Sequence, residues 1–248
     1  MRAPIFAANW KLNHGPTEAR AFIQAFVARY APRDDRTVMF FPSALAFAAA
    51  RGAAGARPDL WFGVQNIAAA EQGAFTGENS ALIARDAGAT CALVGHSERR
   101  HVFHETDAAT ADKCAQALTH GLTPILCVGE TLDEREAGHT ETVVLRQVRA
   151  GVSQLTPAQL NTIVVAYEPI WAIGTGRNAT PADAAAVHAV LRAELQRLGA
   201  TARIPILYGG SVKPANAAAL LAAPGVDGLL VGGASLDVES WLGVVQSA

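Results

Sequence analysis

IVVAY occupies residues Ile163–Tyr167, and one acidic residue, Glu168, follows it directly. The run is apolar without alternation, which is typical of a strand covered on both faces, as the strands of a parallel sheet are. Similar short runs recur along the rest of the chain: Ile5–Ala8, Val38–Phe41, Leu60–Val64, Cys91–Val94, Pro124–Val128, Ile204–Tyr208 and Gly228–Val231. The sequence therefore predicts eight strands separated by longer connections.

The connections between these runs contain residues that typically begin and end helices. Thr180-Pro181 predicts an N-cap followed by proline at the first helical position, and the helix is expected to run through Ala184–Leu198. A second helix is predicted over Asp107–His120, after the capping residue Thr106. Strand and helix repeated eight times imply parallel strands with right-handed crossovers. In 248 residues this predicts an α/β fold, a closed (β/α)8 barrel that forms a single domain over residues 1–248.

The composition excludes several classes of protein. Half of the residues are hydrophobic and 17% are charged, so we do not expect disorder, and a formal net charge of -2 does not favour a nucleic-acid partner. No apolar run approaches the roughly 18 residues that a membrane helix needs, and the amino terminus lacks a signal-peptide pattern. Cys91, Cys114 and Cys127 form no CxxC pair and are expected to be buried free thiols, which fits a cytoplasmic location.

Polar residues and glycines follow five of the eight runs, at the end of the strands where a barrel carries its active site. They follow the first, fourth, sixth, seventh and eighth runs and include Asn9, Lys11, His96, Glu98, Glu168, Ser211, Gly232 and Gly233. Each residue alone is weak evidence. Because one topology delivers all of them to the same rim, the combination predicts an active site there.

Two glycine pairs in this set suggest that the site binds phosphate. Gly209-Gly210 and Gly232-Gly233 follow neighbouring strands, and backbone N–H groups at glycine can approach an anion closely. A helix is also expected to start after Gly232-Gly233 and to add its positive end. The alternative is that each pair only makes a tight turn.

The segment after Glu168 is apolar, ends in glycines and has neither a strand nor a helix pattern. An exposed apolar loop is unfavourable unless it closes over something, so we predict a lid that excludes water above Glu168. The alternative is a loop packed permanently on the barrel. The predicted lid consists of Pro169, Ile170, Trp171, Ala172, Ile173, Gly174, Thr175 and Gly176.

Three side chains of the rim have both a chemical and a structural interpretation. Glu168 is placed to act as a base beneath the lid, and the alternative is a helix cap or a surface ion pair. His96 lies at the rim, although a single histidine is more often structural. Lys11 inside a barrel mouth needs a partner, for which Glu98 is available, and its alternative is an ordinary exposed lysine.

Five segments, taken in order, resemble the triosephosphate isomerase family: Asn9–Lys11, Gly95–Arg100, Ala166–Gly176, Tyr208–Val212 and Leu230–Ser235. The resemblance covers essentially the whole chain. It implies a cofactor-free isomerase of glycolysis and gluconeogenesis that interconverts glyceraldehyde 3-phosphate and dihydroxyacetone phosphate through an enediolate. No metal is implied.

The resemblance also implies a role for each rim residue. Glu168 is implied as the base that moves the proton between C1 and C2, and His96 as the neutral electrophile that polarises the carbonyl. Lys11 and Asn9 are implied to bind substrate and stabilise the enediolate, with Glu98 supporting Lys11. The implied phosphate contacts are Gly174, Ser211, Gly232 and Gly233.

The segment Gln72–Glu78 resembles the loop by which members of this family form dimers. In the family it inserts into the second subunit near the residues that match Lys11 and His96, which implies a homodimer with two-fold symmetry. The alternative is a simple surface loop. The residues concerned are Phe75, Thr76, Gly77 and Glu78.

A few residues depart from the family pattern. Asn79 stands where an apolar or β-branched residue is expected, and His104 stands where a small residue is common. His14 is also unusual at its position. None of the three belongs to the predicted catalytic set.

Other functions are weaker alternatives for the same rim. A Schiff-base aldolase needs a lysine at a strand end inside the mouth, and Lys11 is the only candidate. A non-catalytic scaffold on this fold is the second alternative. A metal site is not expected, because His96, His101 and His104 are spaced five and three residues apart and no carboxylate cluster joins them.

Overall fold

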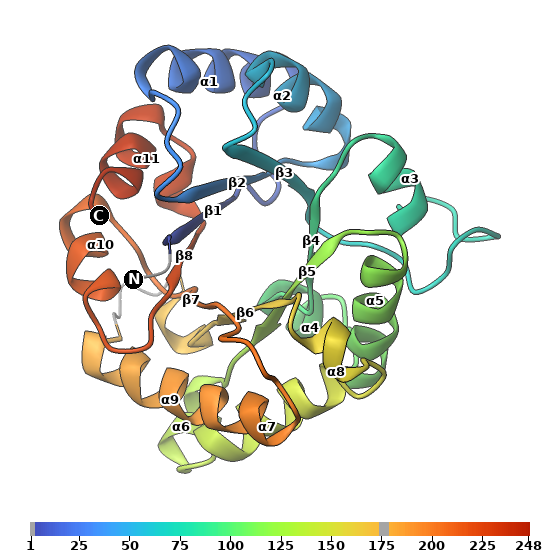
Figure 1. Cartoon of the computed structure of the whole chain (residues 1–248), viewed down its shortest axis with the longest axis vertical. Coiled ribbons are helices and arrows are strands. Elements are labelled where there is room, and N and C mark those ends of the chain that lie inside the picture. Colours follow the sequence, from blue (N-terminus) through green and yellow to red (C-terminus); the bar gives the residue numbers. More distant parts are fainter. Residues whose placement is uncertain (1–2, 174–178) are drawn as a thin grey trace.

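Eight parallel strands close into a barrel in the computed structural model, which describes residues 3–173 and 179–248 (Figure 1). The strands pair in chain order and β8 returns to β1. They are β1 (Ile5–Asn9), β2 (Thr37–Phe41), β3 (Leu60–Val64), β4 (Cys91–Val94), β5 (Thr123–Val128), β6 (Val164–Tyr167), β7 (Ile206–Tyr208) and β8 (Gly228–Val231). The predicted closed barrel is confirmed.

Helices surround the strands as an outer ring (Figure 1). The α-helices of the described residues are α1 (Pro16–Arg29), α2 (Phe47–Ala54), α3 (Ala81–Asp86), α4 (Ser97–His101), α5 (Asp107–Thr119), α6 (Leu132–Glu136), α7 (Thr140–Gly151), α8 (Pro157–Leu160), α9 (Pro181–Arg197), α10 (Pro214–Leu221) and α11 (Val238–Val245). Short 3-10 turns are η1 (Ala44–Ala46), η2 (Ile170–Ala172) and η3 (Gly233–Ser235).

The two helices predicted from capping signals are α9 and α5. Thr180 caps α9 by accepting a hydrogen bond from the Asp183 N–H at 3.1 Å, and the Asp183 carboxylate accepts the Thr180 N–H at 2.9 Å. This reciprocal capping box satisfies amides that the helix cannot pair internally. Thr106 caps α5 through the Ala109 N–H at 3.1 Å.

The predicted bounds of β3, β4 and β8 are confirmed, and the other five strand predictions differ from the structure by one or two residues at one end. The largest difference is at β7, which begins at Ile206 although the apolar run begins at Ile204. Pro205 has no N–H to donate to a sheet ladder, which explains the later start. Asn9, which the prediction placed just after the first run, is the last residue of β1.

The core has two parts, because alternate residues of each strand face opposite sides. Ile5 and Ala7 face the barrel interior, whereas Phe6 and Ala8 pack against the surrounding helices. The interior cluster consists of Ile5, Ala7, Met39, Phe41, Cys91, Leu93, Ile125, Cys127, Val164, Ala166, Leu207 and Leu230. The barrel interior is therefore filled with packed side chains, and the rim with the predicted site lies above this core.

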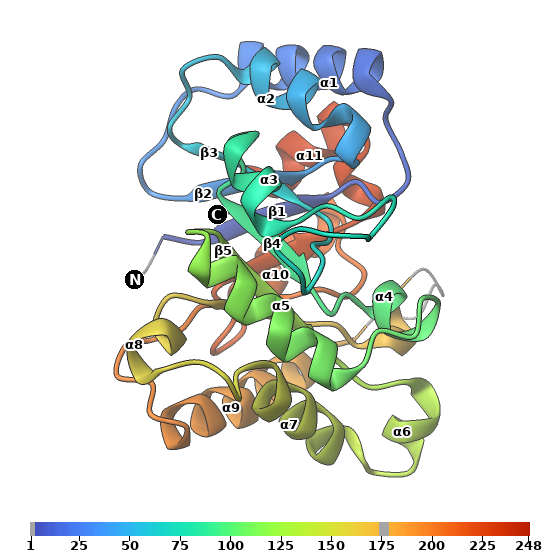
Figure 2. The same ribbon diagram turned by 90° about the vertical axis from the view of Figure 1, so that its right-hand side faces the viewer.

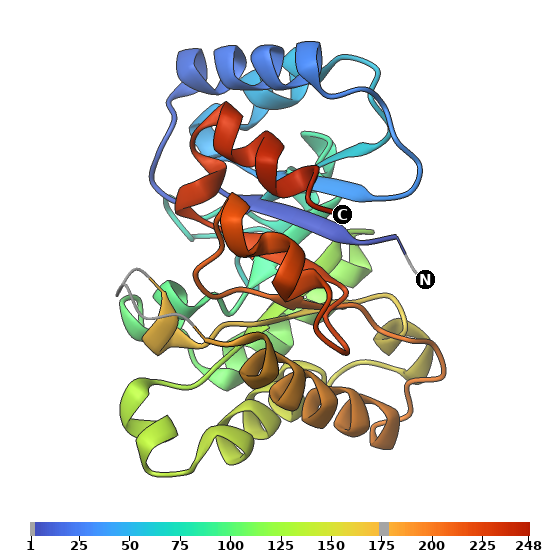
Figure 3. The same cartoon turned by 90° about the vertical axis from the view of Figure 1, so that its left-hand side faces the viewer.

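The predicted state of the cysteines is confirmed, since Cys91, Cys114 and Cys127 are buried and free. Among the described helices, none is both long and apolar enough to cross a membrane. The side views place the beginning of β1 at the end of the barrel opposite α4 (Figures 2 and 3). The connection between β3 and α3, which contains Gln72–Glu78, extends outward beyond the ring of helices (Figure 1).

Candidate active site

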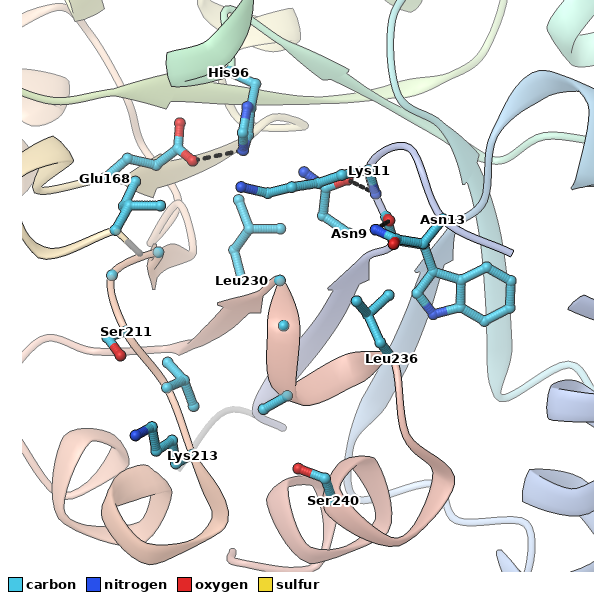
Figure 4. Close-up of a pocket in the computed structure, with 18 of the residues that line it drawn as sticks. Asn9, Lys11, Asn13, His96, Glu168, Ser211, Lys213, Leu230, Leu236 and Ser240 are labelled. Carbon is cyan, nitrogen blue, oxygen red and sulfur yellow. Dashed lines mark hydrogen bonds and ion pairs between the residues drawn. The ribbon is translucent and has the colours of Figure 1, made fainter. Parts of the chain in front are cut away.

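A cavity of about 580 Å³ opens at the carboxyl ends of the strands (Figure 4). Its lining includes most of the predicted site residues: Asn9, Lys11, His96, Glu168, Ser211, Gly232 and Gly233. Glu98 stands beside the cavity as the ion-pair partner of Lys11. Gly174, Thr175 and Gly176, which belong to the predicted lid and phosphate set, lie outside the described residues.

Glu168 and His96 meet at one wall of the cavity and point toward each other (Figure 4). The distance between His96 Nε2 and Glu168 Oε1 is 2.9 Å. The second carboxylate oxygen, Oε2, accepts the backbone N–H of Ser97 at 2.9 Å. Glu168 is only 2% exposed and His96 only 6%, so both groups are removed from bulk water. The alternatives of a surface ion pair for Glu168 and a structural histidine at 96 do not fit this pairing inside a cavity.

The position of His96 follows from the local backbone. β4 ends at Val94, and His96 is the N-cap of the short helix α4. Its Nδ1 accepts the N–H of Glu98 at 3.3 Å, which requires a lone pair on that nitrogen. The ring then carries its proton on Nε2, where it faces Glu168. This is the tautomer of a neutral imidazole whose N–H donor points into the cavity.

The buried pair shifts the pKa of each member. Burial favours the neutral forms of both, so it lowers the pKa of His96 and raises that of Glu168. Burial is the largest single influence, but the opposite charge and the hydrogen bond across the pair, with the other neighbours, together outweigh it, and the net result is a raised pKa for His96 and a lowered pKa for Glu168. The Ser97 N–H and the nearby Lys11 lower the pKa of Glu168 further. Glu168 is therefore held as a carboxylate, which is the form that a base needs.

Lys11 is held in place by two contacts. Its ammonium lies 2.6 Å from Glu98 Oε1, so the predicted counter-charge is confirmed. Its backbone N–H donates to Asn9 Oδ1 at 3.1 Å. The backbone of Lys11 has a φ of 52°, a left-handed conformation that costs free energy in a residue with a side chain. Gln65, a residue that sequence analysis did not single out, accommodates this turn by donating to the Lys11 carbonyl at 2.8 Å.

The two glycine pairs serve different purposes. A Cβ added to Gly210 would lie 2.1 Å from Tyr208 Oη, and one added to Gly209 would lie 2.9 Å from Glu168 Cγ. The first pair is thus required for close packing around Tyr208 and Glu168. A Cβ added to Gly233 would meet nothing within 4 Å, so this part of the loop is open to the cavity.

The helix expected to start after Gly232-Gly233 is present there only as a short 3-10 turn. The 3-10 turn η3 begins at Gly233, and the α-helix α11 begins only at Val238. Ser235 explains the tight turn, because its hydroxyl donates to the carbonyl of Gly232 at 2.7 Å and competes with a helical pattern. Any amide contribution to phosphate binding here comes from the turn, and the dipole of a full helix is not available.

Sequence analysis missed Glu130, which lies two residues beyond β5 and is completely buried. Its Oε1 accepts the Tyr167 hydroxyl at 3.1 Å and the Trp171 indole N–H at 2.9 Å. Arg135 Nη1 lies 3.5 Å from the same oxygen. Glu130 therefore holds both the residue before Glu168 and the start of the predicted lid. The rule that found Glu168, a polar residue just past a strand, would also have found Glu130.

A family model described as triosephosphate isomerase matches residues 4–248. The chain belongs to the triosephosphate isomerase family. A protein named triosephosphate isomerase from Symbiobacterium thermophilum is 48% identical over 252 residues, covering 100% of this chain and 98% of that protein. One from Roseiflexus castenholzii is 47% identical and covers 99% of this chain and 98% of its own. The protein of that name from Thermus thermophilus is 45% identical over the full length of both chains.

Membership of the triosephosphate isomerase family decides between the functions that the sequence left open. The Schiff-base aldolase needed Lys11 as a nucleophile, but its ammonium is held in an ion pair with Glu98. The non-catalytic scaffold needed a degenerate rim, but Glu168 and His96 are present and paired. The chain is an isomerase of this family.

Proposed function

We propose that this cavity interconverts glyceraldehyde 3-phosphate and dihydroxyacetone phosphate, the step of glycolysis and gluconeogenesis for which the family is named. The observation that carries the proposal is the 2.9 Å pairing of the Glu168 carboxylate with the His96 imidazole inside the cavity. One group can remove a proton from carbon while the other donates a hydrogen bond to oxygen, which is what isomerisation of a hydroxy carbonyl compound requires.

The proposed reaction uses these groups in sequence. Glu168 takes a proton from the carbon beside the carbonyl, and the electron pair of that C–H bond forms the double bond of an enediolate while the carbonyl electrons move onto oxygen. The His96 Nε2–H and the Lys11 ammonium stabilise the oxyanion. The hydroxyl proton of the neighbouring oxygen passes through His96 to this oxyanion, and Glu168 returns its own proton to the former carbonyl carbon as the new carbonyl forms, so that atoms and charge balance. Asn9 supports this arrangement through the Lys11 N–H.

Glu168 is not yet free to act as a base in the arrangement described. Its two oxygens are bonded to His96 and to the Ser97 N–H. We expect substrate to compete for the His96 donor with its carbonyl oxygen and thereby release one carboxylate oxygen toward the substrate carbon. Loss of that contact also weakens the upward shift in the pKa of His96, which favours a neutral ring during catalysis.

The substrate phosphate is assigned to the open side of the cavity. Ser211, Gly232 and Gly233 line it, and Gly233 has room for an anion above its backbone. Gly174 completes the proposed set. Residues Pro169–Gly176 are the proposed lid, in which the described part begins with η2 and Ile173 lines the cavity. Closure of the lid would exclude water from an enediolate phosphate that could otherwise expel its phosphate.

A homodimer is proposed as the working assembly. Six large apolar side chains are more than half exposed among the described residues, and all of them lie in the connections that follow β1, β2, β3 and β4. Water-exposed apolar side chains concentrated on one side of a barrel are typical of a surface that another subunit covers. They are Leu12, Leu45, Phe75, Ile83, Val102 and Phe103.

The proposed dimer contact is tested at Phe75, which is 54% exposed in the projecting segment Gln72–Glu78. We expect Phe75→Asp to sediment as a monomer at concentrations where the unaltered chain sediments as a dimer. If the unaltered chain itself sediments as a monomer, the proposed homodimer is rejected. The proposed compartment is the cytoplasm, and the three buried free thiols support it.

The activity itself is tested by a coupled assay. Dihydroxyacetone phosphate formed from glyceraldehyde 3-phosphate is reduced by a second enzyme and followed through its nicotinamide cofactor. The purified chain is preincubated with chelator and assayed without added metal. We expect full turnover, and Glu168→Gln serves as the matched inactive protein. Turnover by the unaltered chain no faster than by this variant would reject the proposal.

A further inference from the structure

Three residues other than glycine adopt a left-handed backbone among those described: Lys11, His14 and His104, with φ of 52°, 57° and 57°. Two of them lie in the same connection, between β1 and α1. This conformation is unfavourable for residues with a Cβ and persists only where the surroundings hold it. The strain at Lys11 belongs to the active site. The reason for the strain at His14 is found in the contacts of its side chain.

The imidazole of His14 lies between two loops of the barrel rim. Its Nε2 is 3.1 Å from the carbonyl oxygen of Leu236, a residue more than 200 positions later in the chain. The ring packs edge-on against Trp10, with ring centroids 4.9 Å apart, and against Phe22 at 5.6 Å. The other nitrogen, Nδ1, is 3.9 Å from Glu18. The side chain is only 19% exposed, so its position is well defined by its neighbours.

Leu236 is the C-cap of η3, the turn Gly233–Ser235 on the side of the cavity that is assigned to the substrate phosphate. Its N–H donates to the Gly233 carbonyl at 3.1 Å, and it closes η3 directly after Ser235. A second link between the same two loops runs from the Trp10 indole N–H to the Ser235 carbonyl at 3.1 Å. Figure 4 shows Leu236 beside the loop that carries Asn9, Lys11 and Asn13. Two hydrogen bonds therefore join the loop of the Lys11 ammonium to the loop of Gly232 and Gly233.

We propose that His14 is a positioning residue for the substrate phosphate, through its bond to the Leu236 carbonyl. His14 holds the turn η3 at a fixed distance from Lys11. A substrate whose phosphate binds at Gly233 then has its reacting carbons beside the Lys11 ammonium and Glu168. This inference rests on the proposed function, because it assumes that the ligand carries a phosphate at one end and the reacting carbons at the other.

The first variant is His14→Gly, which removes the tether while the backbone at this position becomes unstrained. We expect KM for glyceraldehyde 3-phosphate and the inhibition constant of inorganic phosphate to rise together by roughly three- to tenfold, the effect of losing one hydrogen bond. Turnover at saturating substrate should change by less than about twofold. D-glyceraldehyde, which lacks the phosphate, should be isomerised as well as by the unaltered chain.

Two further variants separate positioning from a general loss of structure. His14→Gln places an amide donor near the position of Nε2, and we expect it to restore most of the phosphate affinity. His104→Gly removes the same side chain from the same backbone conformation, but at an exposed position outside the cavity lining. We expect it to leave the inhibition constant of phosphate unchanged.

The outcomes distinguish this inference from the proposed function. An unaltered chain that does not isomerise glyceraldehyde 3-phosphate would reject the proposed function. An active chain in which His14→Gly binds inorganic phosphate as well as before would overturn the role of His14. The role is also overturned if D-glyceraldehyde turnover falls as much as the phosphorylated reaction, because His14 would then act on the reacting centre and not through the phosphate.

Discussion

Two buried glutamates stand just past the ends of neighbouring strands, Glu130 after β5 and Glu168 after β6. Both are almost inaccessible to water. Glu168 lines the cavity, and its partners are a histidine and a backbone amide. Glu130 does not line it, and its partners are Tyr167 and Trp171 side chains that it holds from behind.

Burial and position are alike for the two carboxylates, so their partners decide which one is available to a substrate. The Tyr167 hydroxyl and the Trp171 indole N–H donate to Glu130, so moving that carboxylate would remove the acceptor of the buried Tyr167 hydroxyl. The His96 donor can instead be taken over by a substrate oxygen. Residues that face the cavity should therefore change kinetics, and residues behind it should change stability.

The largest expected effect is on turnover, from Glu168→Gln. The amide keeps the shape of the side chain but cannot accept the proton, so we expect kcat to fall by about 10²–10⁴-fold with little change in KM. The coupled assay measures both, and a thermal melt should show a folded protein. Turnover within about tenfold of normal would show that another group is the base.

The complementary variant is Glu130→Ala, which should damage stability more than turnover. It removes the acceptor of the buried Tyr167 hydroxyl, and we expect a loss of about 3 kcal/mol in the free energy of unfolding. Urea unfolding at neutral pH measures it. If Glu130→Ala is as stable as the unaltered chain and its kcat falls as far as that of Glu168→Gln, Glu130 is not a structural residue.

A second residue behind the cavity makes stability depend on pH. Burial lowers the pKa of His188 to about 4 from its ordinary 6.5. Between these values the unfolded chain binds a proton that the folded chain does not, so acid favours unfolding. We expect a contribution of about 3 kcal/mol that is present above pH 6.5 and is lost as pH falls toward 4.

The matched variant for this effect is His188→Asn, which does not titrate. Its amide can still donate to the Gly225 carbonyl that His188 Nδ1 contacts at 3.1 Å. Unfolding free energies measured from pH 4 to 7 should converge for the two proteins at acid pH. Parallel curves over this range would mean that folding does not lower the pKa of His188.

The smallest effect is expected at Gly233, which faces the cavity. A Cβ added there meets no atom within 4 Å, so we expect Gly233→Asp to fold normally and to act by its charge. We expect KM to rise by roughly tenfold, because a carboxylate repels the substrate phosphate. Gly233→Asn is the control of equal size. An equal rise in KM for both variants would assign the effect to shape and not to charge.

The barrel and most of its site follow from the sequence because they depend on local patterns. Continuous apolar runs require strands covered on both faces, and the polar residues just beyond them must meet at one rim. The close packing at Gly209-Gly210 could not be predicted, because it depends on where the Tyr208 side chain turns and on Glu168, which approaches from the neighbouring strand β6. The left-handed backbone at His14 is likewise decided by Leu236, which lies far away in the chain.

The most direct test of the account shortens both glutamates by the same methylene. Glu168→Asp and Glu130→Asp are compared for kcat and for the free energy of unfolding under identical conditions. The account predicts that Glu168→Asp lowers kcat on the order of 100-fold and leaves stability nearly unchanged, because a base withdrawn by one bond misses its proton. For Glu130→Asp we expect the free energy of unfolding to fall and kcat to stay nearly unchanged. Equal losses of kcat in the two variants would contradict it.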